Sequence, residues 1–179
     1  MKIYTYTHSI RVGLLCLDMG LELCLTTGEL RLLGYAGLLH DIGKRRIPAR
    51  ILAKTSSLNA YEKEVMKAHP RLSFLELDDA EYDLVKAVVV AHHEFKVDPY
   101  PRQRKERRKR KRYSDERRSP KKLIAKLGGI VAVADIFDAL VSRRAYKSSM
   151  PKEDIERVLC QQFTGYQRLI KLILQRCDA

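Results

Sequence analysis

Hydrophobic residues recur at steps of three and four along most of the chain, which is the period of an amphipathic α-helix. The pattern predicts helices over about residues 3–25, 26–42, 59–69, 81–94, 122–142 and 166–176, with one more beginning near Pro151. No pair of alternating strands and no glycine-rich phosphate loop interrupts this pattern. We therefore expect an all-α fold, a bundle of roughly six to eight helices with no sheet.

Capping signals mark two of the helix starts. Thr26 and Asn59 are each followed three residues later by a glutamate, Glu29 and Glu62, which is the spacing of a capping box. The helix that follows Thr26 has Arg31 as its only interior charge and is apolar nearly all round. A helix of that kind is usually buried, so we expect it to lie at the centre of the bundle.

Glycines and a proline indicate how these helices pack and end. Gly34 and Gly37 would let a neighbouring helix approach closely, because neither carries a side chain. Gly43 is expected to end the helix that contains them. The helix predicted to begin near Asn59 is expected to end at about residue 69. Pro70 follows, and the residue before a proline avoids the helical conformation.

Length and composition indicate one soluble domain over residues 1–179. The chain is 45% hydrophobic and 32% charged, which is ordinary for a globular protein. It has no apolar stretch of about 20 residues that could span a membrane, and its start lacks the apolar core of a signal peptide. Four cysteines without a Cys-x-x-Cys pair are expected to be reduced core thiols (Cys16, Cys24, Cys160 and Cys177). We therefore expect a cytoplasmic protein.

The net charge of +13 comes mostly from one segment. Residues 102–122 hold 13 of the 35 lysines and arginines and only three acidic residues. Self-repulsion and the lack of apolar anchors predict a mobile basic loop or a frayed helix over 96–122. It is either a solvated loop, a weak contact for RNA or DNA, or a flap that attracts an anionic substrate.

The chain has five histidines: His8, His40, His69, His92 and His93. A single histidine is more often a packed or surface residue than a ligand. These five, however, fall on the apolar faces or at the ends of four predicted helices. A histidine that points inward must be hydrogen-bonded or bound to a metal, and bundles build metal sites from such side chains on facing helices.

Two carboxylates fit the same interpretation. Asp41 adjoins His40, and Asp135 interrupts the apolar run 130–134. A buried aspartate needs a partner, so Asp135 is either a metal ligand or a structural residue paired with the backbone or an arginine. Adjacent helical residues diverge by about 100°, so His40 with Asp41, and His92 with His93, suit two neighbouring metals better than one.

The ordered residues resemble the HD superfamily of metal-dependent phosphohydrolases. The resemblance covers His8, His40-Asp41-Ile42-Gly43-Lys44, His69-Pro70, His92-His93-Glu94 and Val133 to Leu140. It is strongest to the HD-GYP branch, whose known activity is hydrolysis of cyclic di-GMP. The resemblance implies an HD-domain helical bundle and assigns metal ligands to His8, His40, Asp41, His69, His92, His93 and Asp135. It also makes Lys44 the catalytic lysine and places substrate-phosphate contacts at Arg144 and Lys147.

Two departures from the family pattern change what the resemblance implies. Tyr4 stands where members with a third metal carry a glutamate, so we expect two divalent ions, Fe or Mn, with Zn, Ni or Co also able to fill the site. The branch's Asp-Gly-x-Gly-Tyr-Pro loop is shortened here to Asp98-Pro99-Tyr100-Pro101. A loop that relies on glycine for positive φ cannot keep its shape without it, which leaves specificity for cyclic di-GMP open.

The leading hypothesis is a phosphodiesterase that cleaves a cyclic dinucleotide with a hydroxide activated by two metals. Asp41 would bridge the ions, and Lys44 would stabilise charge on the phosphoryl oxygens. The alternative is a catalytically degenerate signalling module that binds a nucleotide or protein without hydrolysis, which the altered loop favours. A purely binding role would not need the complete set of ligands and Lys44, which argues for the enzyme.

Overall fold

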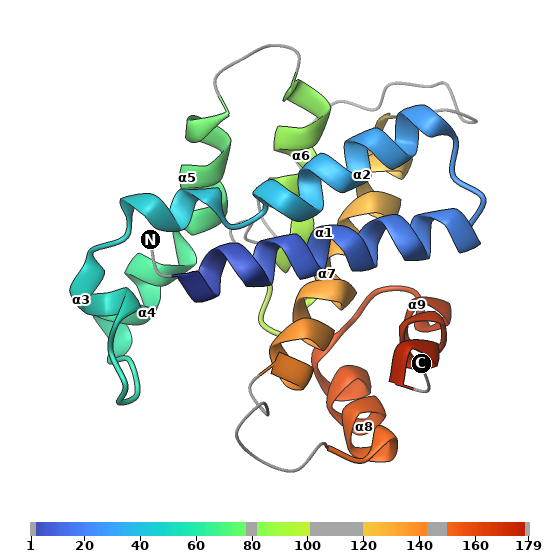
Figure 1. Ribbon diagram of the computed structural model, residues 1–179. Helices are drawn as coiled ribbons and strands as arrows, with labels where there is room; N and C mark the ends of the chain where they lie inside the picture. Colours follow the sequence, from blue (N-terminus) through green and yellow to red (C-terminus); the bar gives the residue numbers. More distant parts are fainter. Residues whose placement is uncertain (1–2, 78–81, 101–119, 143–149, 178–179) are drawn as a thin grey trace.

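The computed structural model describes residues 3–77, 82–100, 120–142 and 150–177. These residues form helices joined by turns, as Figure 1 shows, and a single isolated bridge joins the extended backbone of Lys96 and Phe163. The all-α prediction is therefore confirmed.

The helices follow in chain order. They are α1 (Ile3–Glu22), α2 (Thr27–Leu39), α3 (Ala49–Leu52), α4 (Ala60–Lys67), α5 (His69–Glu76), α6 (Asp83–Ala91), α7 (Pro120–Ser142), α8 (Lys152–Gln162) and α9 (Gln167–Leu174). Short 3₁₀ turns follow α2 (η1, Ile42–Arg46), α6 (η3, His92–Phe95) and α9 (η5, Gln175–Cys177). Helix α7 begins at Pro120, so the last three residues of the predicted basic loop are helical. Residues 101–119 of that loop lie outside the described part of the chain.

Both predicted capping boxes are present. The Thr26 side chain accepts a hydrogen bond from the backbone of Glu29, and the Glu29 side chain accepts one from the backbone of Thr26 at 2.9 Å. Asn59 and Glu62 make the same pair of bonds at the start of α4. These bonds satisfy backbone N–H groups that the first helical turn leaves without partners.

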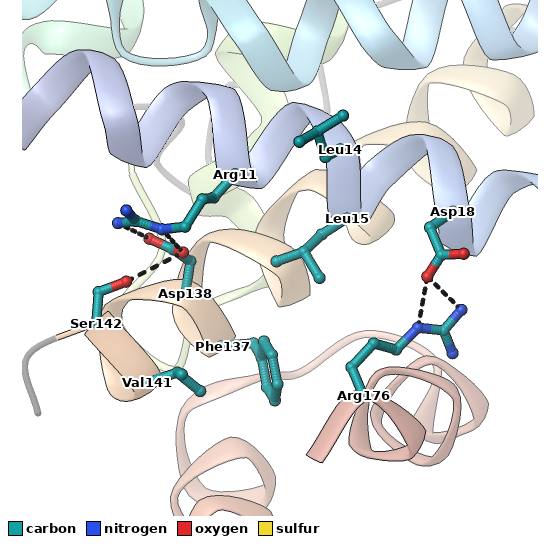
Figure 2. Close-up of a pocket in the computed structure, with 9 residues that line it drawn as sticks. All are labelled: Arg11, Leu14, Leu15, Asp18, Phe137, Asp138, Val141, Ser142 and Arg176. Atoms are coloured by element: carbon teal, nitrogen blue, oxygen red, sulfur yellow. Dashed lines mark hydrogen bonds and ion pairs between the residues drawn. The ribbon is translucent and has the colours of Figure 1, made fainter. Parts of the chain in front are cut away.

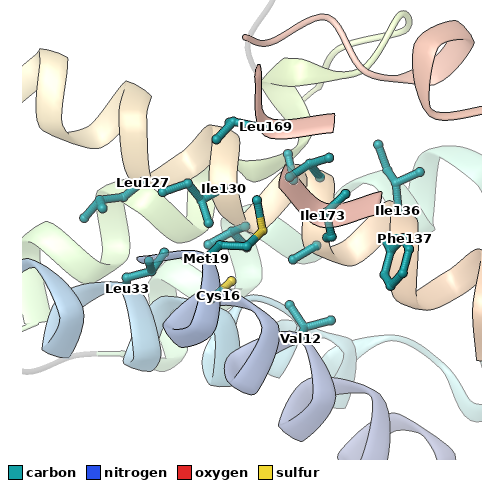
Figure 3. Close-up of a cluster of buried hydrophobic side chains, with 14 of the residues drawn as sticks. Val12, Cys16, Met19, Leu33, Leu127, Ile130, Ile136, Phe137, Leu169 and Ile173 are labelled. Carbon is teal, nitrogen blue, oxygen red and sulfur yellow. The ribbon is translucent and has the colours of Figure 1, made fainter. Parts of the chain in front are cut away.

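The central helix is α7, which contacts α1, α2, α6, α8 and α9. Residues 127–134 of α7 are buried on every side. Figure 3 shows α7 side chains meeting the apolar faces of α1 and α9, including Ile130 against Met19 and Ile173. This cluster is the hydrophobic core among the described residues.

The prediction that the helix after Thr26 is the central one was wrong. Helix α2 packs against α1 and α6 with one side, while Tyr35 and Leu38 on its other side are 42% and 44% exposed. Both helices contain long apolar runs with few charges between them, so the sequence pattern does not distinguish the surface helix α2 from the buried helix α7.

At two glycines, Gly37 and Gly43, the backbones of neighbouring elements lie close together. A Cβ on Gly37 would lie 2.9 Å from the Cα of Gly13, so α1 and α2 pack closely at this point, as predicted. Gly43 does not end α2, because that helix stops at Leu39. Gly43 lies instead in η1 against the backbone of α5, where a Cβ would clash with the His69 carbonyl and the Ser73 amide.

Among the described residues the four cysteines form no disulfide, and only Cys16 is fully buried in the core. Cys24 and Cys160 are exposed, so the prediction of core thiols was wrong for these two, while Cys177 is partly buried and packs against the core. Cys24 lies just after the end of α1, and Cys160 lies on the exposed side of α8. The spacing of the cysteines along the chain does not indicate either position. Among the described residues, no helix is long and apolar enough to cross a membrane.

Candidate metal centre

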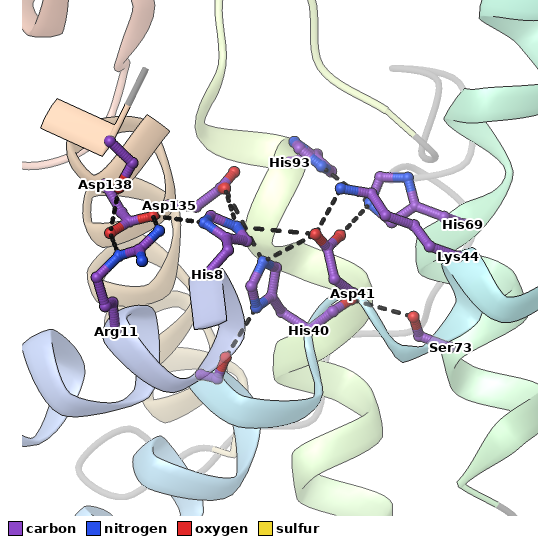
Figure 4. A network of polar contacts seen from close by, with 12 residues as sticks. His8, Arg11, His40, Asp41, Lys44, His69, Ser73, His93, Asp135 and Asp138 are labelled. Carbon is purple, nitrogen blue, oxygen red and sulfur yellow. Dashed lines mark hydrogen bonds and ion pairs between the residues drawn. The ribbon is translucent and has the colours of Figure 1, made fainter. Parts of the chain in front are cut away.

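The five histidines come together where α1, α2, α5 and η3 face α7. His8 lies on α1, His40 follows α2, His69 begins α5, and His92 and His93 begin η3. None is more than 7% exposed. Figure 4 shows most of them around Asp41, and the His40 and His92 rings lie 5.2 Å apart.

Backbone hydrogen bonds orient three of these imidazoles in the same way. The Nδ1 atoms of His40 and His69 each lie 2.8 Å from the carbonyl oxygen three residues earlier, and His92 makes the same contact. This bond places the proton on Nδ1 and leaves the Nε2 lone pair free. The Nε2 atoms of His40 and His92 are buried without a hydrogen-bond partner among the described residues. Such atoms need a partner, and a metal cation would supply it.

Asp41 lies between two halves of this cluster and is 2% exposed. Its Oδ1 atom is 3.2 Å from His69 Nε2. Its Oδ2 atom is 3.4 Å from His40 Nε2 and 3.8 Å from His8 Nε2. Lys44 also donates to Oδ2, at 2.5 Å. The two oxygens of one carboxylate therefore face different histidines.

Asp135 faces the same cluster from α7. Its Oδ1 atom is 3.3 Å from His8 Nε2 and 3.9 Å from His40 Nε2. Its Oδ2 atom accepts a hydrogen bond from Lys96 at 3.3 Å. Asp135 is thus paired with Lys96 and still presents one oxygen to the histidines. The sequence analysis did not predict the role of Lys96.

Among the described residues, two groups of side chains have donor atoms close enough to hold an ion. One group is His69, His92 and His93, and the other is His8, His40 and Asp41, with the donor atoms in each group within 4.8 Å of one another. Mixed imidazole and carboxylate ligands suit first-row divalent ions. The residues present therefore fit metal ions.

Burial keeps three of the histidines in the form that binds metals. It lowers the pKa of His69 to about 4 and lowers the pKa values of His92 and His93 further. Neutral imidazoles are therefore present at pH 7, and a neutral ring is required for coordination.

The carboxylates are held in their charged form. Burial alone would raise the pKa of Asp41, but the charges of His40 and Lys44 outweigh it and hold the pKa well below its usual range. For Asp135, Lys96 and His8 outweigh burial in the same way. Ionised carboxylates next to neutral imidazoles form a site that attracts cations.

His8 differs from these three histidines. Burial would lower its pKa, but hydrogen bonds to Asp135 and Asp138 outweigh burial and raise the pKa to about 9. Without a metal, His8 therefore carries a proton at neutral pH. A metal ion that binds Nε2 would have to displace that proton, which couples metal binding to pH.

Asp138 belongs to the site although the sequence analysis left it out of the ligand set. Its Oδ2 atom accepts a bond from His8 Nδ1 at 2.6 Å, and Arg11 donates to both of its oxygens. The spacing gave a usable signal, since Asp138 is three residues after Asp135 and so shares its helix face.

A cavity of about 380 Å³ adjoins Asp138 on the side of α1 and α7. Figure 2 shows its apolar lining, which includes Leu14, Leu15, Phe137 and Val141. The Arg11–Asp138 and Arg176–Asp18 ion pairs lie at its edges. The metal-ligand candidates do not line this cavity.

Three sequence predictions fall outside what the structure describes. Arg144 and Lys147, the expected phosphate contacts, lie in residues 143–149, which are not described. The side chain of Tyr4 is also not described, so its replacement of a third-metal ligand stays a prediction.

The fold and this cluster define a class of protein, and comparison with known families agrees. The HD domain family matches residues 5–140, so the chain belongs to the HD domain family. The match spans α1 to α7 and includes every candidate ligand described above.

Individual relatives are enzymes that act on cyclic dinucleotides. A cyclic di-GMP phosphodiesterase of Thermotoga maritima is 36% identical over 157 residues, which are 86% of this chain and 39% of that protein. A 3'3'-cGAMP-specific phosphodiesterase of Vibrio cholerae is 30% identical over 97% of this chain and 32% of its own length. The chain thus spans between about a third and two fifths of these relatives.

A solved structure shares the fold. The HD domain of the L. monocytogenes phosphodiesterase PgpH aligns with a TM-score of 0.58 and 21% identity, covering 96% of this chain and 88% of that chain. At that identity the likeness supports the helical arrangement alone.

Proposed function

We propose that the chain is a metal-dependent phosphodiesterase that hydrolyses a cyclic dinucleotide, either cyclic di-GMP or 3'3'-cGAMP. The observation that carries the proposal is the position of Asp41, whose two oxygens face histidines of two separate buried groups. The activities named for the relatives supply the class of substrate.

The proposed centre holds two divalent ions, Fe or Mn, with Zn, Ni or Co as other possible occupants. His69, His92 and His93 would hold one ion, His8, His40 and Asp135 the other, and Asp41 would contact both. When bound, the ions would lower the pKa of a water molecule and neutralise charge on the phosphate.

The side chains around the ions would position the substrate and hold the ligands in place. Lys44 donates to Asp41 and is about a quarter exposed, so its ammonium group can also reach a phosphate oxygen at the site. Arg11 holds Asp138, and Asp138 holds the His8 ring. Arg144 and Lys147 would contact the substrate phosphate, as the family resemblance predicts.

The degenerate binding module gains no support from the described residues. Asp41, Lys44 and the five histidines are all buried or partly buried in one cluster, which binding without hydrolysis would not require. The basic loop at 96–122 stays a predicted weak contact for RNA or DNA, or for the anionic substrate.

The test is metal content and hydrolysis in the same preparations. Protein purified anaerobically without chelator should carry about two metal equivalents per chain and cleave one of the two cyclic dinucleotides. Asp41→Ala should lose metal and reduce turnover by about 100-fold or more, because it removes the ligand between the two groups.

Asp154→Ala is the matched control, since Asp154 lies on the outer helix α8 and pairs only with Arg157 among the described residues. It should keep both the metal and the activity. A wild-type protein that stays free of metal after Mn or Fe is supplied would overturn the proposal, and so would full activity in Asp41→Ala.

A further inference from the structure

His93 is held differently from the other histidines at the ends of α2, α4 and α6. His40, His69 and His92 each use Nδ1 to bond a backbone carbonyl three residues earlier. The Nδ1 atom of His93 is buried and has no hydrogen-bond partner among the described residues. The ring is only 5% exposed, so packing contributes to its orientation together with the contact between its Nε2 atom and His69 Nε2.

The packing partner is Tyr100. The Tyr100 and His93 rings are stacked, with centroids 4.3 Å apart and planes inclined by 23°. The same tyrosine lies edge-on to His69 at 6.2 Å. Flat stacking of this kind limits the rotation of the smaller ring, because a tilted imidazole would collide with the tyrosine.

Tyr100 is itself fixed by the segment that precedes it. The amide of Val97 donates to the carbonyl of Gln162 at 3.2 Å, and the amide of Thr164 donates to the carbonyl of Phe95 at 2.8 Å. These two bonds attach residues 95–97 to the end of α8.

A lysine from α4 adds a second attachment. Lys67 bonds Asp98 at 3.1 Å, and its ammonium group lies 5.8 Å from the centroid of the Tyr100 ring. The tyrosine is therefore held by the backbone before it and by a cation next to its ring.

We propose that Tyr100 is a positioning residue for His93. By stacking, it holds the imidazole with Nε2 directed at His69 Nε2, 3.1 Å away, and so replaces the backbone hydrogen bond that orients the other rings. This inference rests on the proposed metal centre and adds that one half of it, formed by His69, His92 and His93, depends on an aromatic ring at position 100.

The experiment measures metal binding rather than turnover. Metal-stripped protein is titrated with Mn²⁺ in a calorimeter, where the wild type should show two binding events. Tyr100→Leu and Tyr100→Gln should each weaken one event by about 10- to 100-fold, the usual effect of removing a group that orients a ligand. Tyr100→Phe keeps the ring and should bind like the wild type.

The control is Tyr61→Leu, since the Tyr61 side chain is 71% exposed on α4. Circular dichroism checks that each variant is folded. Two variants without an aromatic ring are used so that the test can still be made if one of them does not fold. A double-mutant cycle then locates the effect. Tyr100→Leu should add nothing in a His93→Ala background but should still weaken binding in a His8→Ala background.

The outcomes separate this inference from the proposed function. If the wild type binds two ions and Tyr100→Leu binds them equally well, the positioning role is wrong and the metal centre stands. A loss in Tyr100→Phe as large as in Tyr100→Leu, or a loss that persists without His93, would also overturn it. A wild type that binds no metal would overturn the proposed function itself.

Discussion

Asp138 connects His8 to Arg11 through hydrogen bonds on both of its carboxylate oxygens. The bond to His8 Nδ1 directs Nε2 of the same ring toward Asp135 and Asp41. A carboxylate in this position fixes the orientation of a histidine and raises its basicity without touching the metal. At the residue scale the centre therefore depends on side chains behind the candidate ligands.

Asp138→Asn tests this arrangement. The amide keeps the size of the side chain but removes its charge, so we expect Mn²⁺ affinity to fall by about 10- to 100-fold. Calorimetric titration measures the change, and Asp154→Asn on the outer surface is the control. Unchanged affinity would mean that His8 is oriented by its helix alone.

The contact between η1 and α5 joins Asp41 to His69 at the scale of elements. Gly43 donates to Ser73 Oγ at 2.8 Å, and Ser73 Oγ donates to the His40 carbonyl at 3.0 Å. No side chain fits between Gly43 and the α5 backbone. This contact fixes how far His69 lies from Asp41.

Gly43→Ala should therefore be destabilising. The added methyl group would push η1 away from α5, and we expect the free energy of unfolding to fall by about 1–3 kcal/mol in urea titrations, with weaker metal binding. Gly28→Ala in α2 is the control, because a Cβ there meets nothing within 4 Å. It should leave stability unchanged or slightly raised. Equal effects of the two substitutions would contradict the role of Gly43.

The ligand candidates come from segments that meet only in the folded molecule. They lie on different helices or at helix ends, and they meet beside α7, which itself carries Asp135 (His8, His40, His69, His92 and Asp135). Ions that bind such a site bind the folded state and not the unfolded chain, so binding and folding are linked.

Metal binding should accordingly stabilise the whole molecule. With free Mn²⁺ at about 1,000 times its dissociation constant, the free energy of unfolding should rise by about 4 kcal/mol, and a chelator should reverse the gain. Thermal denaturation with and without metal measures it. His40→Ala should reduce the gain, because it removes a ligand of one of the two proposed ions, whereas an undiminished gain in that variant would place the metal elsewhere.

The C-terminal helix α9 closes the core over α7. Ile173 is fully buried, and Ile173→Ala should lower the free energy of unfolding by about 2–5 kcal/mol. Ile10→Ala removes the same atoms from a side chain that is 52% exposed, and it should cost much less. Similar losses for both would mean that α9 contributes little to the core.

The sequence by itself determined the features that depend on neighbours three or four residues apart. The helical class, the capping boxes at Thr26 and Asn59 and the inward direction of the histidines all follow from local periodicity, and the structure agrees with them. The set of candidate ligands came from residue types in a fixed order, and the structure brings them together.

Tertiary packing decided which helix is central and which side chains orient the ligands. Helix α7 is central because it has neighbours on all sides, while α2, equally apolar, has them on one side only. His8 and Asp138 are 130 residues apart in sequence, and Lys96 reaches Asp135 across 39 residues. These pairs form because α1 and η3 pack against α7, and a periodicity that involves neighbouring residues contains no information about such contacts.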